Sequence, residues 1–176
     1  QKLGAQQLYA YLSAFGFGQR SGISCPGETS GSLSAFNTWS TIDTGAISFG
    51  QGVSVSAIQL ITAASAIANG GVLMKPLLVK AIVDRNGQAV AAFSPETVRR
   101  VISPQTAATM RRILKSVISE GGTGVNAALK GYTVGGKTGT AQKIDKSGTY
   151  AKGKYIASFL GFAPVDQPEL AILVVV

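Results

Sequence analysis

Apolar residues recur at helical spacing in three stretches of the chain, and each stretch predicts a helix. The first runs from Gln1 to Phe15, and glycines of the kind that end helices follow it. The second, about Ser56 to Asn69, is apolar on nearly every side, which predicts a buried helix. The third begins at Ser103-Pro104, a capping serine followed by a proline at the first helical position. Its apolar side chains form a single stripe: Met110, Ile113, Leu114, Val117 and Ile118.

Runs rich in β-branched and aromatic residues predict five strands. Two of them, Leu77 to Asp84 and Ala89 to Phe93, flank Asn86-Gly87, a dipeptide typical of a tight hairpin turn. The other three lie near the end of the chain: Tyr132 to Gln142, Tyr155 to Ala163 and Leu170 to Val176. The turns expected between these three centre on Lys146-Ser147-Gly148 and Asp166-Gln167-Pro168. Short turns between consecutive strands predict an antiparallel meander.

The segment between the first two helices lacks a regular pattern. Ser21 to Asp43 carries the turn signals Pro26-Gly27 and Ser30-Gly31 and is expected to be mostly loop. Ala46 to Gly52 is expected to lead from this loop into the second helix. Trp39, within the loop, is expected to be a packing anchor, with contact to a substrate as the alternative.

The composition is that of a globular protein. At 176 residues the chain is one domain or a large part of one, and 22 glycines indicate many turns or glycine-dependent strand positions. No apolar run reaches the ~18 residues needed to span a membrane, and nothing at the start resembles a signal peptide. The sequence stops on Leu173-Val174-Val175-Val176, in mid-strand by its pattern, so we expect a fragment.

The inventory of nucleophiles and bases excludes several kinds of site. The chain has no histidine, so it holds no Ser-His-Asp triad. Its single cysteine, Cys25, permits neither an internal disulfide nor a thiolate-rich metal site, and we expect no metal or cofactor. Beside Pro26-Gly27, Cys25 is expected to be a loop or buried thiol rather than a nucleophile. A nucleophile must therefore be activated by a lysine or a carboxylate, or must lie outside the segment.

The net charge of +8 is of the kind found in proteins that bind nucleic acids or anionic surfaces. The basic residues are scattered except for one small cluster: Arg99, Arg100, Arg111, Arg112 and Lys115. No aromatic residues interleave with this cluster, as a platform for single-stranded nucleic acid requires. We therefore expect the cluster to be a solvated helix face and expect no nucleic acid partner.

One glycine-rich stretch, Gly131 to Gln142, matches two incompatible chemistries. Gly131, Gly136, Lys137 and Thr138 fit the P-loop pattern G-x-x-x-x-G-K-[ST], which binds nucleotide phosphates at a helix N-terminus. Lys137-Thr138-Gly139 is also the K-T-G triplet of serine acyl-transfer enzymes. A P-loop must follow a buried strand and open a helix, but no β-branched run precedes the motif and poor helix formers follow the triplet. The residues from Tyr132 to Ala141 instead suit a strand. We therefore interpret the P-loop match as accidental.

Other short motifs occur in the order typical of one family. They include Phe15-Gly16-Phe17-Gly18, Pro26-Gly27-Glu28, Ser48-Phe49-Gly50-Gln51-Gly52, Ala68-Asn69-Gly70-Gly71, Gly121-Gly122-Thr123-Gly124 and Gly135 to Lys143. With them, essentially the whole chain resembles the C-terminal part of the transpeptidase domain of a class B penicillin-binding protein of the division type. The resemblance implies an α+β fold with helices packed on an antiparallel sheet. It also implies a peptidoglycan D,D-transpeptidase that β-lactams acylate.

Two of the family's three active-site motifs do not occur in the sequence. No lysine has a serine three places before it, and no asparagine has a serine two places before it, so S-x-x-K and S-x-N are missing. The resemblance places both motifs before Gln1, and a further strand and helix after Val176. We therefore expect residues 1–176 to be the C-terminal portion of one transpeptidase domain and to be inactive alone.

The resemblance assigns roles to the K-T-G stretch. Lys137 attracts the substrate carboxylate, the hydroxyls of Thr138 and Thr140 donate to it, and Gly139 leaves the strand edge bare. The backbone N–H of Thr140 is expected to be one donor of the oxyanion hole. The implied partners are a peptidoglycan stem peptide, β-lactams and division proteins. The implied location is the extracytoplasmic side of the bacterial inner membrane, with the anchor outside this chain.

Several alternatives stay open at this point. Gly135-Gly136 fits either a β-bulge or the architecture of the site. Ser48 lacks a neighbouring lysine or histidine and is expected to be structural or to line a cleft. A second hypothesis for the protein is a penicillin-binding-like sensor or binding module without catalysis, against which intact upstream S-x-x-K and S-x-N motifs would argue. Nucleotide binding, the remote alternative, predicts stabilisation by ATP with magnesium.

Overall fold

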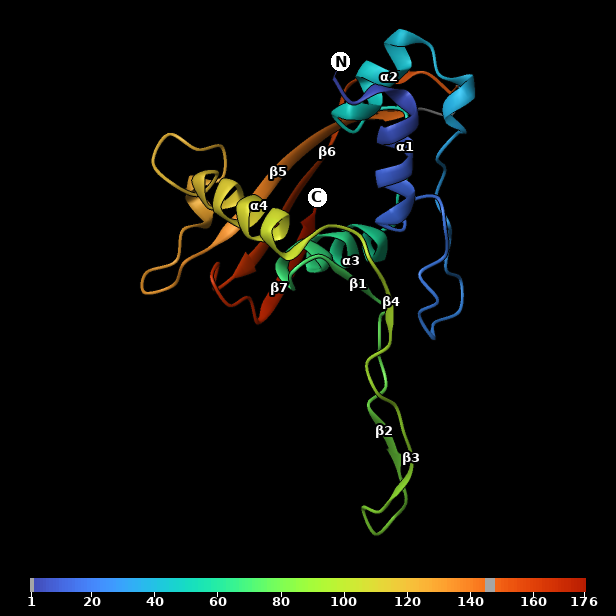
Figure 1. Ribbon diagram of the computed structural model, residues 1–176, viewed down its shortest axis with the longest axis vertical. Helices are drawn as coiled ribbons and strands as arrows, with labels where there is room; N and C mark the ends of the chain where they lie inside the picture. Colours follow the sequence, from blue (N-terminus) through green and yellow to red (C-terminus); the bar gives the residue numbers. More distant parts are fainter. Residues whose placement is uncertain (1, 145–147) are drawn as a thin grey trace.

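The fold combines α-helices with antiparallel strands, and the computed structural model describes residues 2–144 and 148–176 (Figure 1). The helices are α1 (Gly4–Ala14), α2 (Thr41–Ser48), α3 (Ala57–Ala68) and α4 (Pro104–Ser116), with the 3-10 turns η1 (Phe36–Thr38) and η2 (Val125–Ala127). The strands are β1 (Val72–Met74), β2 (Ala81–Val83), β3 (Ala89–Ala92), β4 (Thr97–Arg100), β5 (Gly135–Ile144), β6 (Tyr150–Ala163) and β7 (Leu170–Val175). The expected α+β class is confirmed.

Strands β5, β6 and β7 form the predicted antiparallel meander, in that order across the sheet. The pairing of β5 with β6 runs without a slip from Gly135↔Phe162 to Gln142↔Tyr155 and becomes irregular only beyond Gln142. Strand β6 begins at Tyr150, earlier than the predicted Tyr155. The sheet therefore holds β5 in a fixed register along the whole of its glycine-rich part.

Of the three turns predicted between strands, two lie within the described residues, and both are confirmed. Around Asn86-Gly87, the N–H of Asp84 donates to the carbonyl of Gln88 (2.9 Å), and the left-handed φ of Gly87 (+80°) closes the β2–β3 hairpin. This hairpin extends away from the rest of the molecule as an arm (Figure 1). Asp166-Gln167-Pro168 separates β6 from β7. The third predicted turn, Lys146-Ser147-Gly148, falls partly on residues 145–147, which lie outside the described residues.

A second antiparallel pair, β1 with β4, was not predicted. Leu73 lies opposite Arg99, and Val72 lies opposite Arg100. The chain reaches this pair through Gly71, whose φ of +94° favours glycine. A Cβ on Gly71 would also collide with the carbonyl of Ile102. The corner between α3 and β1 therefore needs a glycine.

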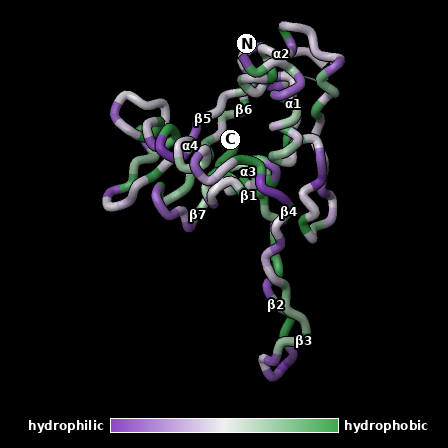
Figure 2. Tube along the Cα trace, viewed as in Figure 1, coloured by the Kyte–Doolittle hydropathy of each residue, from purple (hydrophilic) through white to green (hydrophobic). Residues whose placement is uncertain are grey.

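Helix α3 lies at the centre of the fold, as its apolar sequence predicted. It contacts β1, β6, β7 and α4, and Figure 2 shows it as a hydrophobic segment in the middle of the molecule. Its buried apolar residues are all small: Ala63, Ala64, Ala66 and Ala68. The predicted stripe on α4 is wrong at Ile113, which is 54% exposed. Among the described residues, no helix has the length and hydrophobicity that crossing a bilayer requires.

Helix α2 was not predicted. Ser21 to Asp43 is mostly loop, as expected, but its last residues open a helix that runs to Ser48, where the sequence predicted only a lead into the next helix. Helix α2 begins after Ser40, where a capping box forms: the Ser40 hydroxyl accepts from the N–H of Asp43, and the Asp43 carboxylate accepts from the N–H of Ser40 (2.8 Å). The hydroxyl of Ser40 also lowers the pKa of Asp43 by donating to its carboxylate. Gly45 in the helix interior masked this helix in the sequence.

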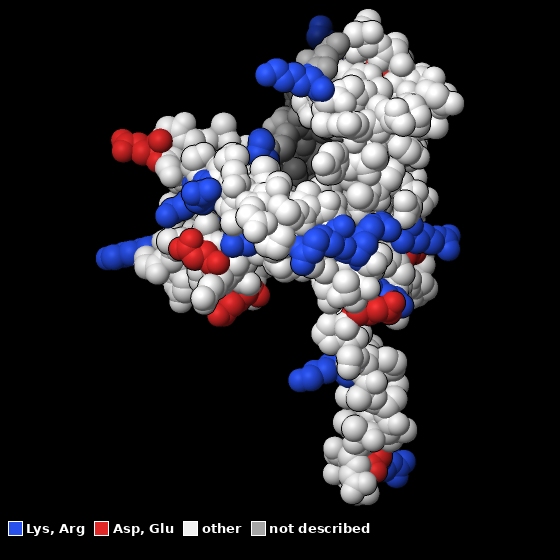
Figure 3. Space-filling model, viewed as in Figure 1, with Lys and Arg blue, Asp and Glu red and all other residues white. Residues whose placement is uncertain are grey.

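The basic cluster is not the solvated helix face that the sequence predicted. Arg99, Arg100 and Arg111 each donate to a backbone carbonyl at or just past the end of a helix. Arg99 Nε lies 2.8 Å from the carbonyl of Ala14, the last residue of α1, and Arg111 lies 3.1 Å from that of Ala68 at the end of α3. Cations there satisfy unpaired carbonyls and oppose the helix dipole. The other two cluster residues, Arg112 and Lys115, are exposed. On the face of the molecule drawn in Figure 3, Lys and Arg side chains form a band.

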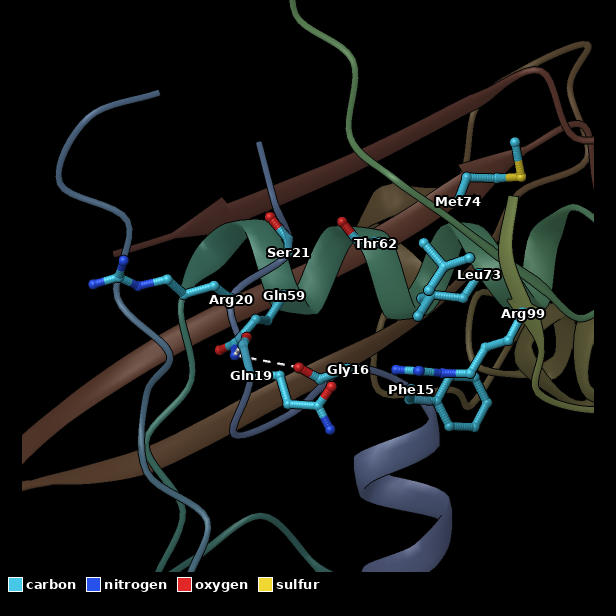
Figure 4. A pocket seen from close by; sticks show the side chains of 11 residues that line it. Phe15, Gly16, Gln19, Arg20, Ser21, Gln59, Thr62, Leu73, Met74 and Arg99 are labelled. Carbon is cyan, nitrogen blue, oxygen red and sulfur yellow. Dashed lines mark hydrogen bonds between the residues drawn. The ribbon is translucent and has the colours of Figure 1, made fainter. Parts of the chain in front are cut away.

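Gln59 joins the start of α3 to two loops. Its side chain is 2% exposed, and its Oε1 accepts from the N–H of Ser56 (2.8 Å). Its Nε2 donates to the carbonyls of Gln19 (2.7 Å) and Ser30 (2.8 Å), and more weakly to Gly16 (3.3 Å; Figure 4). The cavity drawn in Figure 4, of about 90 Å³, lies beside it. Because no residue of the K-T-G stretch lines this cavity, it is not part of the candidate site.

Candidate active site

The K-T-G stretch lies on an edge strand. Within the described residues, the sheet order places β5 beside β6 only. Residues Lys137 to Thr140 pair in sequence with Leu160 to Ala157, and the strand continues to Ile144. The predicted strand is therefore confirmed. A helix does not follow the triplet, which removes the phosphate-binding helix N-terminus that a P-loop needs.

The backbone of Thr140 points away from β6. Its partner on β6, Ala157, uses both its N–H and its C=O to bond Val176 (3.0 and 2.9 Å). Since the N–H and C=O of one strand residue point to the same side, Ala157 has neither group available toward β5. Thr140↔Ala157 is therefore a non-hydrogen-bonded pair, and the N–H of Thr140 faces the open edge. Thr138, two residues earlier, presents its N–H and C=O to the same edge.

The side chain of Lys137 lies at this open edge. It is exposed, and its Nζ donates to the carbonyl of Thr138 (2.7 Å). That carbonyl is available because the pairing with β6 does not use it. The edge thus combines an ammonium group with the N–H of Thr140, two donors that suit an anion.

Gly135 and Gly136 are buried in a regular ladder, so the β-bulge alternative is excluded. A Cβ on Gly135 would lie 2.8 Å from Cζ of Phe162. A Cβ on Gly136 would lie 2.7 Å from Cζ of Phe159 and 2.6 Å from the carbonyl oxygen of Leu160. The two glycines let two rings of β6 lie against β5, and this packing fixes the start of the K-T-G stretch.

Gly139 keeps one face of β5 clear. Its partner is Ser158, and a Cβ on Gly139 would lie 2.6 Å from the Oγ of that serine. Alternation along the strand places Gly139 on the same face as Lys137. A side chain at this position would therefore crowd both Ser158 and the space beside the lysine.

A threonine from another part of the chain reaches the K-T-G stretch. Oγ1 of Thr123 lies 2.8 Å from Oγ1 of Thr138, a hydrogen bond in which either hydroxyl is the donor. Thr123 belongs to Gly121-Gly122-Thr123-Gly124, in the turn after α4. This segment is one of the motifs on which the family resemblance rests, but no role was predicted for Thr123. Its available signal was a hydroxyl placed between glycines.

Three other residues that the sequence singled out lie outside the K-T-G stretch, in a helix end, a ring contact and a loop. Ser48, the last residue of α2, donates its hydroxyl to the carbonyl of Gly45 (2.6 Å). Trp39 packs edge-on against Tyr9, with ring centroids 5.9 Å apart, as a packing anchor would. Cys25 is exposed in a loop. Among the described residues, no three His, Cys, Asp or Glu side chains gather as a metal site would require.

Comparisons with known proteins agree with this geometry. Residues 1–176 match the family model described as the penicillin binding protein transpeptidase domain. Stage V sporulation protein D of Bacillus subtilis is 44% identical over all of this chain, which spans 27% of that protein. The probable peptidoglycan D,D-transpeptidase PenA of Neisseria meningitidis is 37% identical over 99% of this chain and 28% of its own length.

A solved structure gives the same result. Penicillin-binding protein 3 of Mycobacterium tuberculosis, complexed with ampicillin, is 36% identical with a TM-score of 0.93, over all of this chain and 40% of that one. The chain thus spans about a quarter of the length of the two curated relatives above. Because the family model covers every residue from 1 to 176, the chain belongs to the transpeptidase-domain family of penicillin-binding proteins.

Proposed function

We propose that these residues form one wall of the active site of a peptidoglycan D,D-transpeptidase, an enzyme that cross-links stem peptides through a serine and is acylated by β-lactams. The observation that carries the proposal is the open edge of β5, where the Lys137 ammonium and the N–H of Thr140 lie together. The relatives support it, since one is named a probable peptidoglycan D,D-transpeptidase and another was solved with ampicillin.

The stem peptide binds along β5 as an added strand. Its backbone pairs with the groups of Thr138 and Thr140 that face the open edge, and Gly139 leaves room for its approach. The Lys137 ammonium attracts the terminal carboxylate of the peptide. The hydroxyls of Thr138 and Thr140 donate to that carboxylate, and bonds to an ionised acceptor are roughly twice as strong as neutral ones.

The reaction is an acyl transfer in two steps. The serine oxygen attacks the carbonyl carbon of the penultimate D-alanine, and the resulting oxyanion accepts a hydrogen bond from the N–H of Thr140. The peptide C–N bond then breaks, and the terminal D-alanine leaves as an amine that has taken up a proton. An amine on a neighbouring peptidoglycan strand then attacks the carbonyl carbon of the serine ester and loses a proton. The ester C–O bond breaks, and the serine oxygen takes up a proton to restore the hydroxyl. One oxyanion donor is typically worth about 10²–10³ in rate.

The nucleophile and its base belong to S-x-x-K, and the proton relay to S-x-N, and neither motif occurs in the 176 residues. We therefore propose that residues 1–176 are the C-terminal portion of the domain and do not react with substrate alone. For the whole protein we propose an anchor in the inner membrane outside this chain, an extracytoplasmic catalytic domain, and division proteins as partners.

Labelling with a fluorescent penicillin tests the proposal. We expect the native full-length polypeptide that contains these residues to be labelled covalently and the isolated 176 residues to remain unlabelled. Lys137→Ala in the full-length polypeptide should slow labelling about 10- to 100-fold, the range for a hydrogen bond to a charged group. Lys130→Ala, at another exposed lysine, is the matched control and should label normally. No labelling of the full-length polypeptide, or stoichiometric labelling of the 176 residues, would contradict the account.

A further inference from the structure

We propose that Thr123 is a positioning residue for the carboxylate site: its hydroxyl holds the Thr138 side chain in the orientation that presents its O–H to the substrate. The inference rests on the proposed function of the β5 edge. It starts from the 2.8 Å contact between the two Oγ1 atoms, which joins the turn after α4 to the K-T-G stretch. Through Thr138, Thr123 thus favours the binding of ligands that carry a carboxylate.

The chemistry of two hydroxyls determines which one donates. Each has one hydrogen and two lone pairs. A carboxylate only accepts, so the hydrogen of Thr138 must point to the substrate and its oxygen must accept from Thr123. The reverse arrangement would turn a lone pair of Thr138 toward an anion. Thr123 thus fixes both the rotamer of Thr138 and the direction of its hydrogen bond, and successive hydrogen bonds of this kind strengthen one another.

The glycines on either side of Thr123 allow its turn to pack closely against neighbouring backbone and side chains. A Cβ on Gly122 would collide with the carbonyl of Val117. A Cβ on Gly124 would lie 3.0 Å from Cδ1 of Ile118, and the N–H of Gly124 donates to the carbonyl of Val117 (2.9 Å). The backbone on both sides of Thr123 is therefore packed against Val117 and Ile118, just past the end of α4. Its hydroxyl comes from a fixed position rather than from a free loop.

The turn and the K-T-G stretch share one packing partner. Phe159 lies opposite Thr138 in the β5–β6 pairing. Its ring would be 3.2 Å from a Cβ on Gly124 and 2.7 Å from one on Gly136. The same ring therefore packs against both the turn that carries Thr123 and the strand that carries Thr138.

The experiment measures the second-order rate constant for acylation of the full-length polypeptide by benzylpenicillin. Thr123→Val removes the hydroxyl and keeps the branched shape, and Thr123→Ala is a second hydroxyl deletion. Each should lower the rate about 3- to 10-fold, the range for one hydrogen bond, while Thr123→Ser should restore it. Ser119→Ala removes another hydroxyl near the same turn, one that lies 3.4 Å from the Lys115 carbonyl, and should leave the rate unchanged.

A double-mutant cycle shows whether Thr123 acts through Thr138. In a Thr138→Ala background, Thr123→Val should have no further effect. An undiminished rate in Thr123→Val and Thr123→Ala, a failure of serine to restore the rate, or an equal loss in the Thr138→Ala background would each overturn the inference. Absence of acylation in the unsubstituted polypeptide would instead refute the proposed function, so the two failures are distinguishable.

Discussion

Replacing Gly136 by alanine tests whether the close contact of β5 with β6 sets the geometry of the K-T-G stretch. The added Cβ would lie 2.6 Å from the carbonyl oxygen of Leu160, which is 0.8 Å less than the 3.4 Å at which ordinary contacts begin. It would also lie 2.7 Å from Cζ of Phe159. The ring is able to rotate, but the carbonyl is β6 backbone and retreats only if the strands separate. Overpacking of this kind costs about 1–3 kcal/mol.

Thermal unfolding and penicillin acylation of the full-length polypeptide measure the consequence. At about 2–4 °C per kcal/mol for a domain of this size class, we expect Gly136→Ala to lower Tm by several degrees. It should also slow acylation, because Lys137 follows directly. Gly45→Ala is the matched control: a Cβ there meets nothing within 4 Å inside helix α2, so it should be neutral or stabilise by about 0.5–1 kcal/mol. Unchanged Tm and acylation in Gly136→Ala would refute the reasoning.

Two further predictions concern the scaffold. Arg99→Met removes the hydrogen bond to the Ala14 carbonyl and should lower the free energy of unfolding, measured by denaturant titration, by about 1–3 kcal/mol. The control Arg112→Met, at an exposed residue, should change this free energy little. Equal effects of the two substitutions would argue against helix capping by Arg99. The hydroxyl of Ser21, by donating to the Glu28 carboxylate, holds the pKa of Glu28 below its usual range. The stabilisation by ionised Glu28 is therefore fully present above the ordinary glutamate pKa of about 4.3 and is lost as pH falls through the lowered pKa. Thermal scans should therefore show a smaller loss of Tm below that pH in Glu28→Gln than in the unsubstituted protein, and parallel curves would contradict this.

The sequence predicted those elements whose signals are local. Helix α3 has an apolar run and a serine cap at Ser56, and the β2–β3 hairpin has Asn86-Gly87 at its turn. Helical periodicity and turn-forming residues are signals within a few neighbouring residues, so each predicts its element without knowledge of the rest of the fold. The meander of β5, β6 and β7 follows from short turns between consecutive strands.

Features that depend on distant residues were not predicted. Strands β1 and β4 have three and four residues, and unlike β2 and β3 they are not joined by a short turn signal. They pair because Val72 and Arg100, distant in the sequence, lie opposite each other. Helix α2 relies on its capping box to outweigh Gly45. The arginine bonds are equally remote, since Arg99 reaches a carbonyl 85 residues earlier. Sequence patterning cannot distinguish such a capping arginine from a solvated one.

The candidate site divides in the same way. The K-T-G triplet and its strand were predicted from composition and motif order. The direction of the Thr140 N–H was not, because it depends on which residue of β6 bonds to β7. The contact of Thr123 with Thr138 depends on the turn after α4. Pairing register and turn geometry therefore supply what the motif alone lacks.

A crystal structure of the full-length polypeptide acylated by benzylpenicillin tests the central claim most directly. The account predicts that the penicillin carboxylate accepts hydrogen bonds from the hydroxyls of Thr138 and Thr140, beside the Lys137 ammonium. It also predicts that the acyl carbonyl oxygen lies about 2.7–3.1 Å from the backbone nitrogen of Thr140. A carboxylate bound away from β5, or an acyl oxygen held by donors that do not include Thr140, would contradict it.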